Sequence, residues 1–188
     1  GVDTDVVTTA VSVTAASNID AVTGLPVDAS LVELATGSGL SWSFDATVLP
    51  SDGNYVVLVA AIDDAGNASG ATRPFSLDTT ISTPSVGTIA VDNIVNDAED
   101  GLITITLSGV DTDGVTTAVS VTAASNINLV TGLPVDASLV MLATGSGLSW
   151  SFDTTSLPVD GDYVVLAGAV DAAGNPAGAV KPFTLDTE

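Results

Sequence analysis

The chain has 188 residues, of which 23 are acidic and two are basic, and its formal charge is −21. Because Arg73 and Lys181 cannot form a basic patch, nucleic acid and anionic membrane surfaces are excluded as partners, and cations are the natural counter-partners. The chain has no cysteine, which rules out disulfides and thiol chemistry. Hydrophobic residues still make up 46% of the chain, and the longest apolar run, 55–62, has the length of a strand and not of a membrane span.

The sequence repeats itself at an offset of 108 residues. "GVDTDVVTTAVSVTAASNI" begins at Gly1, "GVDTDGVTTAVSVTAASNI" begins at Gly109, and the match continues to the end of the chain. Residues 81–108 precede the second copy, and the first copy has no such segment. We therefore expect a partial repeat at 1–78, lacking its first two strands, and a complete repeat at 79–188.

Two explanations account for the missing strands. In a tandem array a preceding stretch of the same protein supplies them, so that the chain is an excerpt of a longer array. In a strand-donating filament a neighbouring molecule supplies them. The array is the simpler explanation because it needs no special assembly.

Seven short strands are expected in the complete repeat, separated by turn signals. They lie at residues 86–91, 102–108, 116–123, 138–144, 148–153, 163–170 and 179–185. Residues 102–108, "LITITLS", alternate cleanly between apolar and polar side chains. Tyr163 and Tyr55 stand where an immunoglobulin-like sandwich places a tyrosine corner, and Trp150 is expected in the core. The pattern predicts an all-β chain of tandem immunoglobulin-like β-sandwich domains, with about seven strands per repeat.

The strand order decides which loops share an end of the sandwich. Loops 109–114 and 171–175 are expected at the N-terminal pole, and loops 96–100 and 157–162 at the opposite pole. The linker 77–80 runs from one pole to the next. The acidic residues therefore gather in loops at both poles.

At the junction of the repeats, one pole offers Asp52 and Asp78, and the facing pole offers Asp111, Asp113 and Asp171. Such carboxylates repel one another unless an ion is present. Calcium takes six to eight oxygen ligands in flexible geometry, whereas zinc and copper favour the absent histidine and cysteine. The sequence favours a calcium site; the alternative is a plain hairpin turn whose acid is solvated.

The ending "YVVLAGAVDAAGNPAGAVKPFTLDT" resembles the tail of the bacterial Ig-like (BIg) domains found in giant RTX adhesins. The segment "DNIVNDAEDG" and the strand "WSFD" resemble the same domains, so that the likeness covers residues 79–187 and the partial repeat. The resemblance implies a long tandem array that binds Ca²⁺ at inter-domain junctions and projects an adhesive tip from the cell.

The resemblance also implies which acids are calcium ligands. The set at the junction of the two repeats is Asp78, Asp111 and Asp171. The set at the next junction is Asp186, Asp97 and Glu99. The set facing a preceding domain is Asp3, Asp5 and Asp63. Ala172 stands where the first copy has Asp64, so Asp64 is expected to be dispensable.

The predicted function is structural: an extracellular extender of a bacterial cell-surface adhesin, whose partners are neighbouring repeats of the same chain. The alternative is a filament subunit completed by strands from adjacent subunits. A sugar- or ice-binding module is a third hypothesis, but threonine in strands is explained by its β propensity. Catalysis is not expected, because no acid is paired with a base in a recognisable motif.

Overall fold

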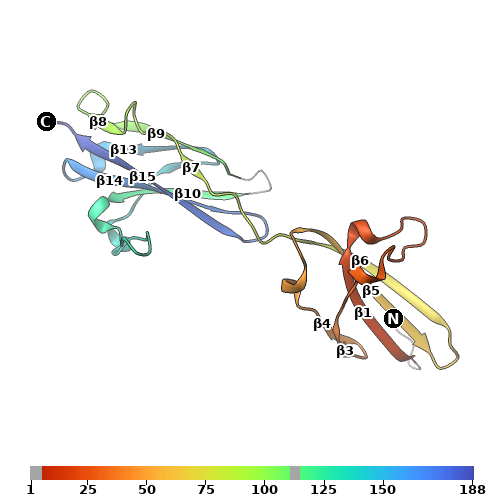
Figure 1. The fold of residues 1–188 in the computed structure, drawn as a ribbon. Helices are drawn as coiled ribbons and strands as arrows, with labels where there is room; N and C mark the ends of the chain where they lie inside the picture. Colours follow the sequence, from red (N-terminus) through yellow and green to blue (C-terminus); the bar gives the residue numbers. More distant parts are fainter. Residues whose placement is uncertain (1–5, 111–114) are drawn as a thin grey trace. The chain divides into compact units, whose positions relative to one another are not determined.

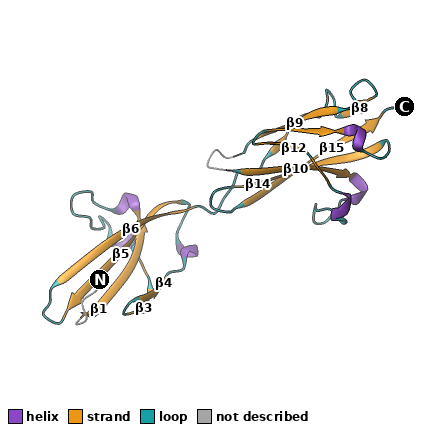
Figure 2. Cartoon of the chain, turned by 180° about the vertical axis from the view of Figure 1, so that it is seen from behind, coloured by secondary structure: helices purple, strands orange, loops and turns teal. Residues whose placement is uncertain are grey.

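Antiparallel strands and short 3-10 turns form both halves of the chain (Figures 1 and 2). The structure is a computed structural model that describes residues 6–110 and 115–188. Internal contacts divide it into two units, Gly1–Thr79 (unit 1) and Thr80–Glu188 (unit 2). The predicted all-β class is confirmed.

Unit 2 is a sandwich of two sheets. In order, the first sheet contains β11 (Met141–Leu142), β10 (Thr116–Ala123), β14 (Gly161–Val170), β15 (Pro176–Asp186) and β8 (Ile94–Asn96). The second contains β12 (Thr144–Ser146), β13 (Ser149–Asp153), β9 (Leu102–Ser108) and β7 (Ser85–Val86). Every pairing is antiparallel except that of β15 with β8.

The core of unit 2 follows from alternation along its strands. In β9, Ile103, Ile105 and Leu107 are buried and the residues between them are exposed, as the pattern "LITITLS" predicts. Tyr163 is buried and its hydroxyl donates to the Val159 carbonyl at 2.7 Å, which confirms the tyrosine corner. Trp150 packs against this core as predicted, but it is only half-buried, and its indole N–H donates to the Gly147 carbonyl at 3.0 Å.

The single strand predicted at 86–91 was wrong. The chain instead forms β7 and β8, which pair with β9 in one sheet and with β15 in the other. Between them, Asn93 has a φ of 72° and its N–H donates to the Ile89 carbonyl at 2.9 Å. Ile89 is fully buried in this crossing, so its apolar side chain serves the core without belonging to a strand.

The strand predicted at 138–144 is also divided between the sheets. A 3-10 turn (Ala137–Leu139) precedes β11, which pairs with β10, and β12 then pairs with β13. Ala143 is buried between the two short strands. Two divided strands account for the nine strands described in unit 2, against about seven expected.

Unit 1 has counterparts of six of these strands. They are β1 (Val6–Ala15), β2 (Glu33–Leu34), β3 (Thr36–Ser38), β4 (Ser41–Ser43), β5 (Gly53–Asp63) and β6 (Ala68–Leu77). They form the sheet β2-β1-β5-β6 and the separate hairpin β3-β4. Within its described residues, unit 1 has no counterpart of β7, β8 or β9, and its buried cluster is reduced to Val13, Leu49 and Tyr55.

Candidate functional site

Asp171 closes the turn that follows β14. Its carboxylate oxygens accept from the backbone N–H and the side-chain amide of Asn175, both at 2.8 Å, and its backbone carbonyl accepts from Gly174 N–H at 3.2 Å. The side chain is only 6% exposed. The acid is therefore neither freely solvated nor free to turn.

Asp63 repeats this arrangement in unit 1. Its oxygens accept from the backbone N–H of Asn67 at 2.7 Å and from the Asn67 amide at 2.8 Å. Asp63 is half-buried. Asp64, beside it, is exposed. The persistence of Asp and Asn in both copies thus has a local structural cause: four residues apart, they hold a tight turn.

These hydrogen bonds set the ionisation of both acids. Burial raises the pKa of the Asp171 carboxyl, but hydrogen bonds from Asn175, Gly174 and Ala173 outweigh it and hold this pKa below its usual value. The side-chain and backbone hydrogen bonds from Asn67 likewise lower the pKa of Asp63. Both turns are therefore stabilised by the ionised acid.

We expect the stability difference between the wild-type chain and an Asp171→Asn variant to depend on pH. A folded-state pKa below the unfolded one contributes stability that is present above the unfolded pKa, near 3.8, and is lost as pH falls through the folded pKa. Urea unfolding of unit 2 should give a constant difference between about pH 5 and 7 that shrinks below about pH 4. Asp63→Asn in unit 1 is the matched replicate, and a difference that stays constant down to pH 3 would contradict the assignment.

Asp52 and Asp160 each bind the residues that follow the last strand of their unit. Asp52 Oδ1 accepts from the backbone N–H and the hydroxyl of Thr79, at 3.0 and 2.7 Å. Asp160, at the same place in unit 2, accepts from the same two groups of Thr187, both at 2.9 Å. The sequence prediction named Asp52 and missed Asp160, which the repeat offset identifies.

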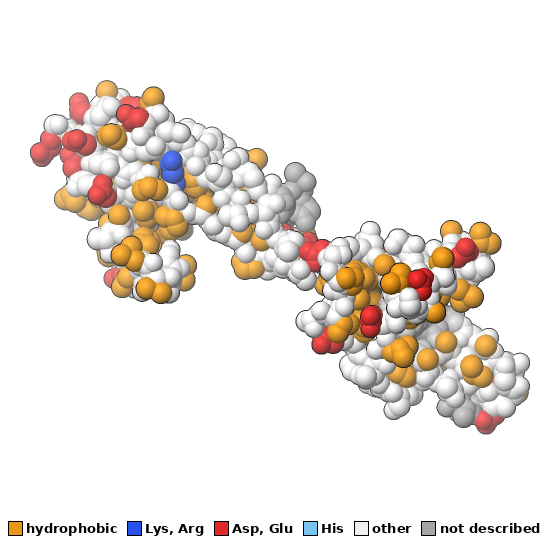
Figure 3. Space-filling view, viewed as in Figure 1, with side chains coloured by type: hydrophobic (Ala, Val, Ile, Leu, Met, Phe, Trp, Pro, Cys, Tyr) orange, Lys and Arg blue, Asp and Glu red, His pale blue; other side chains and the backbone are white. Residues whose placement is uncertain are grey.

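Acidic side chains gather at the end of unit 2 that carries the C-terminus (Figure 3). Asp186 is the register partner of Asn96 in the β15–β8 ladder, so it lies beside the loop that contains Asp97 and Glu99. Asn96 orders that loop, because its amide donates to a Glu99 carboxylate oxygen at 2.7 Å. Asp186, Asp97 and Glu99 thus lie at the same end of the sandwich.

Many other acids cap turns. In the pattern Asp-x-Ser/Thr the carboxylate accepts from the backbone N–H and the hydroxyl of the residue two positions on, at 2.6–3.1 Å. The four acids of this type are Asp28, Asp45, Asp136 and Asp153. Sequence reasoning missed this role, although it explains the excess of aspartate over glutamate: the shorter side chain reaches its own backbone.

The fit to calcium is a matter of donor chemistry. Carboxylates and carbonyls at the loops are hard oxygen ligands of the kind that Ca²⁺ binds. Over residues 6–110 and 115–188, however, no group of three or more acidic side chains lies close enough together to hold a metal ion. Asp3, Asp5, Asp111 and Asp113, which the sequence named as ligands, lie outside the described residues.

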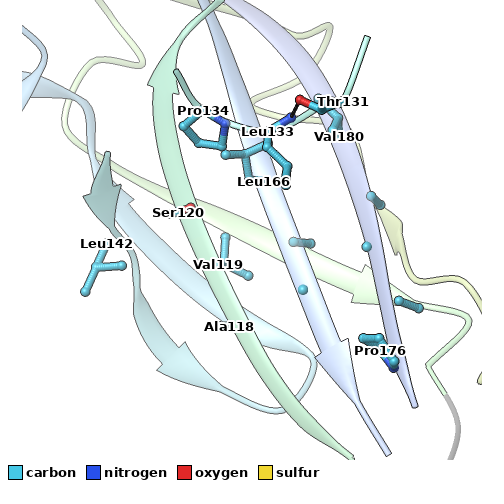
Figure 4. A pocket seen from close by; sticks show the side chains of 16 residues that line it. Ala118, Val119, Ser120, Thr131, Leu133, Pro134, Leu142, Leu166, Pro176 and Val180 are labelled. Carbon is cyan, nitrogen blue, oxygen red and sulfur yellow. Dashed lines mark hydrogen bonds between the residues drawn. The ribbon is translucent and has the colours of Figure 1, made fainter. Parts of the chain in front are cut away.

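An apolar groove lies on the outer face of the β10–β14–β15 sheet (Figure 4). Leu133, Pro134 and Leu166 lie close together at one end of the groove. The Leu133 N–H donates to the Thr131 hydroxyl at 3.3 Å. Unit 1 has the corresponding groove. None of the described residues that line these two grooves is titratable, so neither supplies a general acid or base.

None of the helices found in the described part of the chain has the length and apolar character that a membrane span requires. No protein-family model matches the sequence, and no curated protein matches it.

Among solved structures, the chain is similar to a tetra-tandem repeat from the extending region of a large adhesion protein, with 25% identity, coverage of 95% of this chain and 41% of that one, and a TM-score of 0.37. It is similar to a Ca²⁺-stabilized adhesin with which an Antarctic bacterium binds ice, with 20% identity, coverage of 96% and 40%, and a TM-score of 0.35. A solved chain from a 1.5-MDa bacterial ice-binding adhesin matches with 21% identity, coverage of 100% of this chain and 56% of that one, and a TM-score of 0.38. The chain thus spans about half the length of these solved chains or less, and structures from large adhesins are among its structural neighbours.

Proposed function

We propose that the chain is an extender of a large bacterial cell-surface adhesin, located outside the cell, in which Ca²⁺ stiffens the junctions between tandem immunoglobulin-like domains. Its partners are neighbouring repeats of the same chain. The observation that carries this proposal is a hydrogen bond repeated in both units, from the segment after the last strand to an acid at the end of the unit: Thr79 to Asp52 and Thr187 to Asp160. Each hydrogen bond fixes the residue before the threonine, Asp78 or Asp186, at the end of its unit.

The proposed role is mechanical and requires no catalysis. Each further sandwich unit lengthens the array, and contacts between neighbouring units set the stiffness of the array. The carboxylates near each end repel one another, and a shared cation removes that repulsion. Among the described residues, 6–110 and 115–188, no three acids are close enough together to hold a metal ion. The proposal therefore has two consecutive repeats complete each site together.

Calcium is expected to stabilise the chain by binding only the folded, docked arrangement. With a dissociation constant of roughly 10⁻⁴ to 10⁻³ M, typical of extracellular modules, 10 mM Ca²⁺ should contribute about 1.4–2.7 kcal/mol. Thermal unfolding and small-angle X-ray scattering, each in calcium and in chelator, measure the stabilisation and the elongation. Asp78→Asn should reduce both responses, whereas Asp64→Asn, which removes one charge from an exposed position, should retain them.

Asp78→Asn is a sharper test than Asp171→Ala, because the latter also removes the hydrogen bonds that close its own turn. Equal responses of the Asp78 and Asp64 variants would refute the assigned ligand. Identical scattering curves with and without calcium would refute the stiffening role altogether.

A further inference from the structure

The last strand of unit 2, β15, is open along part of one edge. β14 pairs with β15 over residues 176–185, whereas β8 pairs with it only at 184–186. Among residues 6–110 and 115–188, no strand pairs with the β8 side of β15 over residues 176–183. An open edge presents unpaired backbone groups to the solvent, and a strand of another molecule can pair with them.

Two prolines interrupt the backbone of this edge. The Thr184 N–H donates to the Asn93 carbonyl at 3.0 Å, so the backbone groups of Thr184 point to the β8 side, away from β14. Backbone groups two residues apart along a strand point to the same side, and Pro182 and Pro176 therefore face the open edge as well. Neither proline has an N–H to donate. Of the four residues of 176–183 that face this side, two therefore have no donor for an added strand.

Lys181 lies on the inner face of the same edge. It is on the face of β15 that carries Phe183 and Leu185 into the core, and its register partner Val165 is fully buried. Lys181 itself is half-buried. The long apolar stem of a lysine can pack against a core while its ammonium group remains in water. A strand added beside Lys181 would remove that group from water, and because an unpaired buried charge is costly, an inward-pointing charge on an edge strand opposes such pairing.

The composition sets this lysine apart. The chain has 23 acidic residues and only two basic ones, so its net charge already supplies solubility without a cation. The two basic residues occupy the same place in the repeat: Arg73 is the counterpart of Lys181 at the offset of 108, and Pro74 is the counterpart of Pro182. The two copies thus differ in the side chain but share a positive charge that is followed by a proline.

We propose that Lys181 and Pro182 prevent the open edge of β15 from pairing with a second copy of this chain. The excluded contact is antiparallel pairing of β15 with β15 of the other copy, which would join two sheets into one. Pro182 interrupts that ladder next to the residues that β8 occupies, and Lys181 would carry its charge into the new interface. Copies of the repeat can therefore lie side by side without joining their sheets.

The test compares the full chain with a Lys181→Val/Pro182→Thr variant, which removes the charge and restores the missing N–H. A valine opposite the buried Val165 should keep unit 2 folded, and circular dichroism and thermal unfolding check this. Analytical ultracentrifugation in chelator and about 1 M salt, where the Debye length is about 3 Å, removes calcium and the net charge as causes. The wild type should remain at 18.5 kDa over a concentration series, whereas the variant should shift toward twice that mass as its concentration rises.

Hydrogen exchange locates the contact. In the associated variant the backbone N–H groups of Gly178 and Val180, which face the open edge, should exchange about tenfold more slowly than in the wild type, or slower still. Lys181→Arg keeps the charge and should remain monomeric. Ser120→Val adds a valine at a position of β10 that is paired on both sides, and it should also remain monomeric. Lys181→Gln, the milder change, should associate more strongly than Lys181→Arg even if the double variant does not fold.

Several outcomes would overturn the proposal. A folded double variant that stays monomeric would show that other features close the edge. Association without slower exchange at Gly178 and Val180 would place the contact elsewhere. Equal association of the Ser120→Val variant would show that added apolar surface, and not the edge, is the cause. Equal association of Lys181→Gln and Lys181→Arg would show that the charge at this position plays no part.

Discussion

Replacing Phe183 with alanine is expected to destabilise unit 2 by about 3–5 kcal/mol, the usual cost of removing a fully buried phenylalanine. Phe183 is 3% exposed and stacks on Tyr163 with ring centroids 5.8 Å apart. Its counterpart Phe75 stacks on Tyr55 at 5.7 Å but is only half-buried. Phe75→Ala should therefore cost unit 1 less than half as much, because the side chain still contacts water before it is removed.

The comparison isolates the effect of the covering strands, since the residue and its stacking partner are the same in both units. Guanidinium unfolding followed by tryptophan fluorescence separates the units: a Trp42→Phe background reports on unit 2 through Trp150, and a Trp150→Phe background reports on unit 1 through Trp42. Equal losses of free energy in the two units would show that residues 81–108 do not determine how strongly these phenylalanines contribute.

Gly145→Ala is expected to destabilise unit 2 by about 3 kcal/mol or more, through strain in the β12–β13 hairpin. Gly145 has a φ of 155°, a conformation that side chains with a Cβ rarely adopt. A Cβ atom there would clash with the Ser149 carbonyl oxygen and would lie 2.7 Å from the Trp150 Cα. Because both neighbours are backbone atoms of the paired strand, the clash cannot be relieved by a rotamer change.

Gly147→Ala is the matched control in the same hairpin. Gly147 has a φ of 59°, and a Cβ atom there would have no neighbour within 4 Å. Its replacement should cost only about 1–2 kcal/mol, the penalty of a left-handed conformation. Thermal unfolding of unit 2 measures both variants, and similar losses for the two would argue that the close approach at Gly145 is relieved elsewhere in the sheet.

The sequence predicted β9, β14 and β15 well and two other strands poorly, for one physical reason. In the first three the apolar residues alternate or run continuously, and each strand remains in one sheet throughout its length. The predicted strands 86–91 and 138–144 also have strand-like composition, but the chain leaves one sheet and joins the other near them. Local periodicity does not record such a crossing, because it depends on partners that are distant in the chain.

The candidate site was predicted in part. The sequence correctly placed Asp186 beside the loop of Asp97 and Glu99, because strand order fixes which loops share an end. It did not predict that the Asp171 carboxylate closes its own turn with Asn175. The repeated Asp-x-Ser/Thr pattern carries the same sequence signal, a carboxylate that caps its own turn.

The sequence by itself determined the repeat, the all-β class and the tyrosine corners, since each depends on residues close together in the chain or on comparison of its two copies. Only the tertiary structure decided how much each shared residue is buried. Val57 and Val165 occupy the same place in nearly identical sequences, yet Val165 is fully buried and Val57 is not. A side chain leaves water only when other segments pack over it, and five members of the buried cluster that contains Val165 come from residues 81–108, which unit 1 does not contain.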